Sequence, residues 1–125
     1  KGAGSLGGIY TALVHSKTAY TFITACDMPL LNPAAIRKVV QSATKTDVVV
    51  PYIDESFHPM HAAYSKRCVK PIEEMLKTND LRIHRLLEKV RVKKLLLEDF
   101  GNIAIKESVA NINTKEDLEK LSPPM

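Results

Sequence analysis

Residues 18–29 read TAYTFITACDMP and set an apolar strand directly before an aspartate and a proline. The threonine, tyrosine, phenylalanine and isoleucine side chains favour a buried strand over residues 18–26. Asp27 follows that strand at once, and Pro29 restricts the turn after it. In α/β sheets, ligands gather at the carboxyl ends of the strands. This stretch therefore predicts an α/β fold and the edge of the sheet at which chemistry is expected.

Helical patterns lie on both sides of this strand. Upstream, apolar side chains recur at helical spacing: Leu6, Ile9, Tyr10 and Leu13. Downstream, Asn32 is a predicted N-cap with Pro33 at the first helical position, and the apolar face continues to about residue 43. Three consecutive valines within residues 47–51 predict a short strand that is covered on both faces, as in a parallel sheet.

The rest of the chain continues the alternation of strands and helices. A strand is predicted over residues 61–65, and a helix over residues 70–77, where Pro71 fits only the first turn. Asp80 is expected to cap a further helix, residues 90–97 resemble a strand, and Thr114 begins a capping pattern for a last short helix. We therefore predict one three-layer α/β domain over residues 1–125, with a mostly parallel sheet.

The composition excludes several classes of protein. The chain has 125 residues and a net charge of +4, with 45% hydrophobic and 26% charged residues, which is typical of a globular domain and not of a disordered or fibrous one. No apolar run reaches the ~18 residues of a membrane helix, and the N-terminus lacks the pattern of a signal peptide. The two cysteines indicate neither a zinc site nor a disulfide framework. We expect a cytoplasmic protein that binds neither membranes nor nucleic acid, and whose charge suits anionic substrates.

Two short motifs carry residue types that suit phosphate chemistry. A carboxylate such as Asp27 at the sheet edge can hold Mg²⁺, which prefers one or two carboxylates together with phosphate oxygens and water. The alternative is an aspartate that only caps its turn. Residues 4–8, GSLGG, open a helix whose free backbone N–H groups allow a ligand to approach closely. Their spacing matches neither the Walker motif nor the dinucleotide-binding motif, and a plain tight turn is the alternative.

Four motifs together carry a resemblance to a known family. They are GSLGGI at residues 4–9, ACDMP at residues 25–29, HP at residues 58–59 before an apolar strand, and NINTxxDL at residues 111–118. In this order, and over essentially the whole chain, they resemble the molybdenum cofactor guanylyltransferases and their MobA-like relatives. The resemblance implies a nucleotidyltransferase of Rossmann-like α/β fold. Such an enzyme uses Mg²⁺ to move GMP from GTP to the phosphate of a molybdopterin-type cofactor and releases pyrophosphate.

The resemblance also implies roles for particular residues. Asp27 is the expected metal ligand, and it is also a catalytic and a nucleotide-binding candidate. The glycine-containing helix entry is expected near the nucleotide base and ribose, with Leu6, Gly7 and Gly8 as candidates. The acceptor side is expected to use His58, Arg82, Asn111 and Asn113, of which Asn113 is also a catalytic candidate. Read without the resemblance, the asparagines are polar turn residues, and His58 and Arg82 are solvated surface side chains.

One motif of that family is missing from the sequence. These transferases begin with a strand and a Leu-Ala-Gly-Gly-x-Ser-x-Arg-Met-Gly loop, followed by a lysine, which cradle the triphosphate. We therefore expect that the N-terminal part of the domain is missing. The chain alone should then be inactive, and its uncovered sheet should favour association into a homo-oligomer. The alternatives are transfer of CMP to molybdopterin, transfer of a nucleotide to a sugar phosphate or other small acceptor, and a non-catalytic nucleotide-binding module.

Overall fold

The structure is a computed structural model that describes residues 4–25 and 28–110. Its strands are β1 (Tyr20–Thr24), β2 (Val48–Ile53), β3 (Ser56–Phe57), β4 (His61–Ser65) and β5 (Val92–Leu95). Its α-helices are α1 (Gly4–His15), α2 (Pro33–Gln41), α3 (Val69–Lys77), α4 (Ile83–Lys89) and α5 (Ile105–Ser108), and two short 3-10 helices are η1 (Lys66–Cys68) and η2 (Leu97–Phe100). The predicted alternation of strands and helices is confirmed within this part of the chain, and the helix predicted after Thr114 lies outside it.

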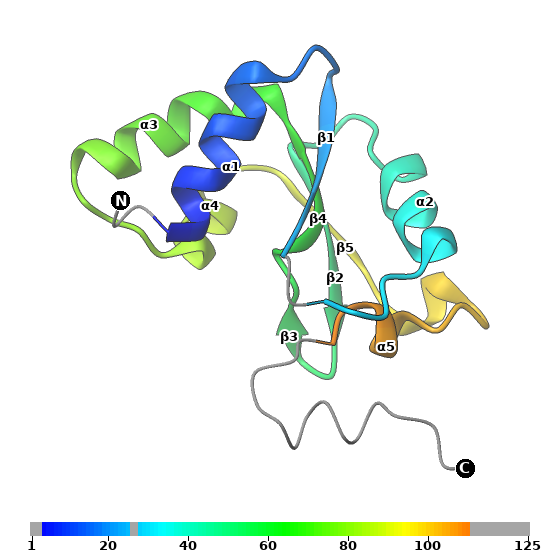
Figure 1. Cartoon of the computed structure of the whole chain (residues 1–125). Coiled ribbons are helices and arrows are strands. Elements are labelled where there is room, and N and C mark those ends of the chain that lie inside the picture. The colour runs from blue at the N-terminus through cyan, green and yellow to red at the C-terminus, as the bar shows by residue number, and fades with distance from the viewer. Residues whose placement is uncertain (1–3, 26–27, 111–125) are drawn as a thin grey trace.

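The sheet has five strands, and its order differs from a simple parallel arrangement. β4 lies between β1 and β2 and runs antiparallel to both, whereas β5 pairs with β2 in parallel. The mixed α/β class is confirmed, but the expectation of a mostly parallel sheet is wrong for the pairings, because β4 separates β1 from β2. Strands β1, β2 and β5 nevertheless point in one direction, so their carboxyl ends share one edge of the sheet (Figure 1).

A tight hairpin turn explains why β4 is antiparallel. Ile53 of β2 is paired with Ser56 of β3, which leaves only Asp54 and Glu55 in the turn. Both turn residues have positive φ, 53° and 62°. Two-residue hairpins need such values, and they are most often built with glycine or asparagine. The turn sends the chain straight back along β2, so β4 adds to the sheet without a crossover helix.

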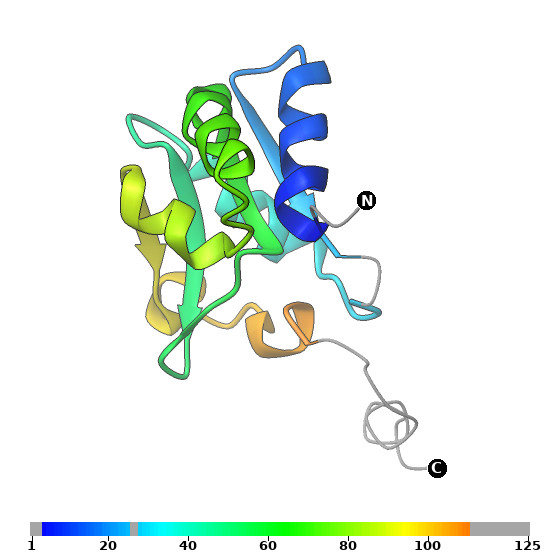
Figure 2. The same ribbon diagram turned by 90° about the vertical axis from the view of Figure 1, so that its left-hand side faces the viewer.

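The three predicted layers are present. Helices α1, α3 and α4 cover one face of the sheet, and α2, η2 and α5 cover the other (Figures 1 and 2). The valine run of β2 shows how both faces are filled, because Val48 and Val50 pack against the first group of helices and Val49 against the second. All three valines are fully buried. The run is therefore apolar throughout because the strand has no solvent-facing side.

Local capping fits the sequence at one helix and differs at another. The Oδ1 atom of Asn32 accepts a hydrogen bond from the amide of Ala34 at 2.8 Å, and Pro33 opens α2 as predicted. The helix predicted after Asp80 begins later, with Arg82 in the N-cap position. The Asp80 carboxylate instead accepts hydrogen bonds from the amide and the guanidinium of Arg82, at 3.4 and 3.2 Å. Asp80 thus stabilises the approach to α4 rather than its first turn.

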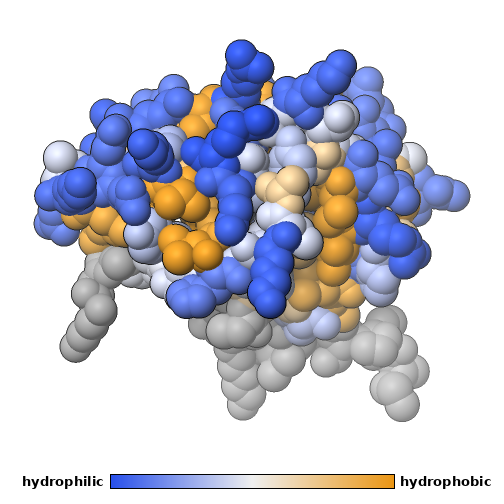
Figure 3. Space-filling view, turned by 90° about the horizontal axis from the view of Figure 1, so that it is seen from above, coloured by the Kyte–Doolittle hydropathy of each residue, from blue (hydrophilic) through white to orange (hydrophobic). Residues whose placement is uncertain are grey.

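The surface opposite the shared carboxyl edge is mostly hydrophilic, with apolar side chains showing between the polar ones (Figure 3). Asp47 lies at this opposite edge, where its carboxylate accepts hydrogen bonds from the Nε atom of Arg67 and the amide of Arg91, both at 3.0 Å.

The helices of the structure were also compared with the length of a membrane span. None of the helices in the described ranges is long and apolar enough to span a membrane.

Candidate functional site

The carboxyl edge of the sheet brings together segments that are distant in sequence. β1 ends at Thr24, which is paired with His61 at the first position of β4. β2 ends at the same edge and continues into the Asp54–Glu55 turn. The helix α5 also lies at this edge, near the end of β2 (Figure 1). The sequence predicted a functional site at the carboxyl edge of the strand that precedes Asp27. In the structure, the segments that follow β1 and β2 meet the helix α5 at this edge.

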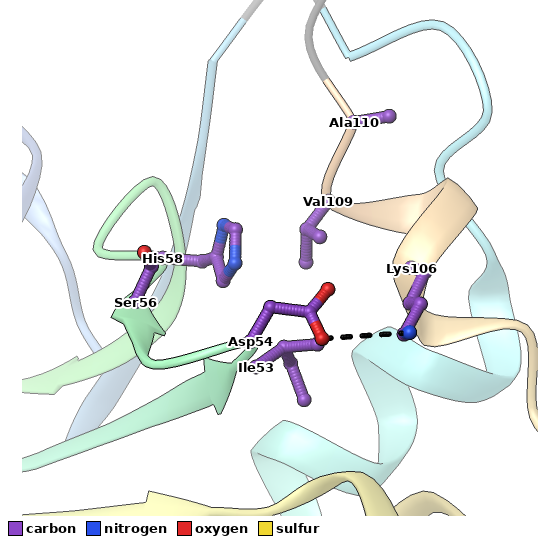
Figure 4. A pocket seen from close by; sticks show the side chains of 7 residues that line it. All are labelled: Ile53, Asp54, Ser56, His58, Lys106, Val109 and Ala110. Atoms are coloured by element: carbon purple, nitrogen blue, oxygen red, sulfur yellow. Dashed lines mark ion pairs between the residues drawn. The ribbon is translucent and has the colours of Figure 1, made fainter.

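A cavity of about 390 Å³ opens at this edge, between the β2–β3 turn and α5 (Figure 4). Its lining combines an apolar wall with a few polar groups, and consists of Ile53, Asp54, Ser56, His58, Lys106, Val109 and Ala110. This volume and mixture of side chains are typical of small-molecule sites. Of the predicted acceptor residues, the structure places His58 in the cavity wall.

His58 is held in place by its backbone and is partly removed from water. Its amide donates to the carbonyl of Pro51 at 3.0 Å, and its carbonyl accepts from the amide of His61 at 3.0 Å. Burial lowers the pKa of the His58 imidazole below its usual value, against smaller opposing effects of the Ile53 backbone and the Asp54 carboxylate. A neutral imidazole at pH 7 can both donate and accept a hydrogen bond inside the cavity.

An ion pair crosses the mouth of the cavity. The Nζ atom of Lys106 lies 3.5 Å from Oδ1 of Asp54, and both side chains are mostly exposed, at 56% and 73% (Figure 4). Ion pairs this exposed contribute about 0–1 kcal/mol to stability. An anionic ligand can therefore take over the Lys106 ammonium at little cost to the fold.

The predicted nucleotide-binding residues lie at the start of α1, on the other face of the sheet. The side chain of Leu6 is fully buried in the core, so only its backbone is available to a ligand. Gly8 is exposed, and a Cβ atom built at Gly8 would meet no atom of the described residues within 4 Å beyond its chain neighbours and the backbone of its own helix. The described part of the chain therefore does not require glycine there. The binding role of Leu6, Gly7 and Gly8 stays a prediction.

The variant Gly8→Ala tests whether a bound nucleotide requires the glycine. It is expected to raise the free energy of unfolding by about 0.5–1 kcal/mol, because alanine is the better residue inside a helix. If a nucleotide lies against this turn, the added methyl group overpacks the contact, which costs about 1–3 kcal/mol and corresponds to binding that is about fivefold to a hundredfold weaker. Urea unfolding and GTP titration measure the two effects, and a stabilised variant with unchanged GTP affinity would remove Gly8 from the site.

Other predicted residues are not joined to the cavity by a described contact. Arg82 is exposed and pairs with Asp80 ahead of α4. Asp27, Asn111 and Asn113 lie outside the described residues. The structure does describe residues on both sides of Asp27, and there the Thr24 hydroxyl lies 3.5 Å from Sδ of buried Met28. It also describes Ala110, which lines the cavity and directly precedes Asn111 in sequence.

The described residues were searched for side chains that could hold a metal ion such as Mg²⁺. Within residues 4–25 and 28–110, no group of three or more histidine, cysteine, aspartate or glutamate side chains is placed to hold a metal ion. The predicted metal ligand Asp27 lies outside these ranges, so its binding of Mg²⁺ stays a prediction.

Sequence reasoning missed several polar residues of this edge. Asp54 and Lys106 belong to no sequence motif, because they come together only where the β2–β3 turn packs against α5. Ser108 and His61 were also missed, although their side chains form a buried hydrogen bond of 2.8 Å. His61 stands three residues after His58, and a histidine at the start of a strand that continues with two alanines was the available signal.

Known proteins similar to this chain carry names that agree with the motifs. Residues 1–95 match the family model of the MobA-like NTP transferase domain. The molybdenum cofactor guanylyltransferase of Desulfosudis oleivorans is 39% identical over 123 residues, which cover 94% of this chain and 59% of that protein.

Two solved structures have a fold similar to that of this chain. The crystal structure of molybdopterin-guanine dinucleotide biosynthesis protein A from Archaeoglobus fulgidus matches with a TM-score of 0.83 and 26% identity, over 94% of this chain and 60% of that one. A crystal structure from Aquifex aeolicus matches with a TM-score of 0.75 and 31% identity, over 89% of this chain and 57% of that one. The chain thus spans less than two thirds of the relatives it matches. The resemblance drawn from the four motifs is confirmed, and the chain belongs to the MobA-like NTP transferase family.

Proposed function

We propose that the protein of which this chain is all or part transfers GMP from GTP to a molybdopterin-type cofactor and releases pyrophosphate. The observation that carries this proposal is the 39% identity to a molybdenum cofactor guanylyltransferase over 94% of this chain. The cavity at the carboxyl edge supports it, because it lies where α/β nucleotide-binding folds place their ligands. The partners are then small molecules, and a cytoplasmic location and a homo-oligomer stay predictions.

In such a transfer the protein mainly aligns the acceptor phosphate with the α-phosphorus and offsets negative charge. Asp27 is the proposed ligand of Mg²⁺, and an ion held there would supply charge stabilisation at the phosphate oxygens. Asn111 and Asn113 are proposed to bind substrate through side-chain amides, which donate and accept hydrogen bonds without adding a charge that would repel the triphosphate. Leu6, Gly7 and Gly8 are proposed to contact the nucleotide.

The cavity beside α5 is the proposed acceptor side. His58 lines it with a neutral imidazole, and Lys106 supplies a cation within reach of its mouth. Arg82 is a second proposed cation for the acceptor phosphate. An acceptor that carries a phosphate and an aromatic or heterocyclic body suits this combination of an apolar wall with a lysine.

Two opposite changes at the ion pair test this assignment. Lys106→Met is expected to raise the KM for the acceptor about threefold to tenfold, because it removes about 1 kcal/mol of charge-assisted binding. Asp54→Asn is expected to leave that KM unchanged or lower, since it frees Lys106, and asparagine tolerates the positive φ of position 54. Steady-state kinetics with varied acceptor measures both.

A matched control is Lys89→Met, which removes another exposed lysine, from the last turn of α4. It is expected to leave the acceptor KM within about twofold, as distant surface changes usually do. An unchanged KM in Lys106→Met, or an equal increase in Lys89→Met, would contradict a specific contact of Lys106 with the acceptor.

The proposed function is tested by nucleotide selection. The 125-residue chain, and the same chain extended by whatever its reading frame encodes on either side, are each supplied with molybdopterin, Mg²⁺ and either GTP or CTP. Formation of the GMP adduct with pyrophosphate in the extended protein is expected, and no turnover is expected from the 125 residues alone. Preference for CTP would overturn the guanylyl assignment, and binding of GTP without turnover in both proteins would favour a non-catalytic module.

A further inference from the structure

A buried hydrogen-bond chain lies directly behind the candidate site. The Nε2 atom of His61 lies 2.8 Å from the Oγ atom of Ser108, and the same Oγ accepts the amide N–H of Asn32 at 2.9 Å. His61 and Ser108 are both fully buried. The ring of Phe22 meets the imidazole edge-on, with ring centres 5.1 Å apart. Three separate elements, β4, α5 and the N-cap of α2, are thus joined through one serine hydroxyl.

The direction of one of these hydrogen bonds is fixed, and that of the other depends on the tautomer of His61. The Asn32 amide donates to Oγ of Ser108, whereas the hydroxyl, with one proton and two acceptor lone pairs, can either donate to Nε2 of His61 or accept from it. Nδ1 of His61 is buried without a partner among the described residues, so Ser108 is the one side chain among them that forms a hydrogen bond with this imidazole. Burial lowers the pKa of His61, which favours the neutral ring. Water does not compete for these bonds, since both side chains are excluded from solvent.

The three residues of this chain sit next to the three segments that carry the predicted site. Asn32 follows Asp27 by five positions, His61 follows His58 by three, and Ser108 precedes Asn111 by three. In the structure, Ser108 belongs to the same short helix as the cavity residue Lys106. His61 is paired with Thr24, the last residue of the strand that leads to Asp27. The serine hydroxyl therefore joins β4, α5 and the start of α2, the described elements that lie next in sequence to the histidine, asparagine and aspartate motifs.

We propose that His61 and Ser108 are positioning residues, which hold the metal-binding, acceptor and asparagine segments in register without touching substrate. This role rests on the proposed function for its effect on turnover, but its effect on structure is independent of it. The hydrogen-bond chain fixes the relative placement of groups that must align acceptor and nucleotide. Misplacement of such groups by about 1 Å can lower turnover a hundredfold.

The variant Ser108→Ala removes the hydroxyl and nothing else, and Ser65→Ala is its matched control. Ser65 is also a buried serine, at 5% exposure, and its Oγ accepts a backbone amide, that of Arg67, at 3.1 Å. It lies at the far end of β4, away from the cavity. Both variants lose the acceptor of one backbone amide, and Ser108→Ala also leaves Nε2 of buried His61 without its partner. A merely structural role therefore predicts a larger loss of stability in Ser108→Ala, with kcat of the folded protein unchanged in both variants.

Two measurements on the extended protein decide the proposal. Hydrogen exchange of the Asn32 amide is expected to accelerate at least about tenfold in Ser108→Ala and to stay unchanged in Ser65→Ala, because only the first loses the acceptor of that amide. The kcat for GMP transfer is expected to fall about tenfold or more in Ser108→Ala, with the KM for GTP within about twofold, since alignment rather than binding is lost. His61→Gln, which keeps a polar group near the Nε2 position, is expected to retain more kcat than His61→Leu.

The outcomes separate this proposal from the proposed function. Faster exchange at Asn32 together with an unchanged kcat would overturn the positioning role while leaving the transferase intact. An equal loss of kcat in Ser65→Ala would also overturn it, because the effect would then be general destabilisation. A wild-type protein without any transfer activity would overturn the proposed function and, with it, the part of this proposal that concerns turnover.

Discussion

Asp27→Asn in the protein that carries this domain is expected to lower GMP transfer by about a hundredfold or more. The carboxylate is the proposed ligand of a magnesium ion whose charge stabilisation at a transferring phosphate is worth several kcal/mol. Asparagine has almost the same size, so the fold should not change. Turnover at saturating GTP and Mg²⁺ measures the loss, and a partial recovery at raised Mg²⁺ concentration would be consistent with weakened metal binding.

The matched control is Asp99→Asn. Asp99 is an exposed aspartate whose Oδ2 atom accepts the amide of Leu96 at 2.7 Å and so caps η2. This change is expected to cost about 1 kcal/mol of stability through the weakened cap and to leave kcat unaltered. Full activity in Asp27→Asn would show that this aspartate only caps its turn, and the magnesium assignment would then fall.

Leu13→Ala is expected to lower the free energy of unfolding by about 2–5 kcal/mol, because it opens a cavity in the core. Leu13 is fully buried and belongs to the cluster in which α1 and α3 pack against the sheet. A loss of this size is a large part of the stability of an ordinary small domain. Urea denaturation followed by circular dichroism measures the change.

The next residue of the same helix provides the comparison. Val14 is 43% exposed, and Val14→Ala is expected to change the free energy of unfolding by no more than about 0.5 kcal/mol. Equal losses in the two variants would mean that α1 is not packed against the sheet through Leu13, and the arrangement of the first layer would have to be revised.

Much of the fold was predictable because local signals and tertiary packing agree. Asn32 and Pro33 mark the start of α2, and the valine run marks β2 as a strand buried on both faces. The direction of β4 was not predictable, because the turn at Asp54 and Glu55 contains no glycine or asparagine to announce a hairpin. The strand therefore gave no sign that it would insert between β1 and β2.

The candidate site was predictable only where a motif is local. His58 is followed by a proline before an apolar strand, and the structure places it in the cavity wall. The pair of Lys106 with Asp54 and the pair of His61 with Ser108 join residues that are about fifty positions apart in sequence. Such pairs form only because α5 packs against the edge of the sheet. The sequence on either side of Lys106 and Ser108 does not predict that packing.

The central claim is that the site lies at the shared carboxyl edge of β1 and β2, and amide chemical-shift mapping with Mg²⁺ and GTP tests it most directly. We expect the largest shifts with GTP in the extended protein at Leu6, Gly7, Gly8, Ala25 and Met28, and further shifts at Ile53, His58 and Ala110 when molybdopterin is added. The opposite edge, around Asp47, Arg67 and Arg91, should stay unchanged. Shifts concentrated at that opposite edge, or no shifts at saturating GTP, would contradict the account.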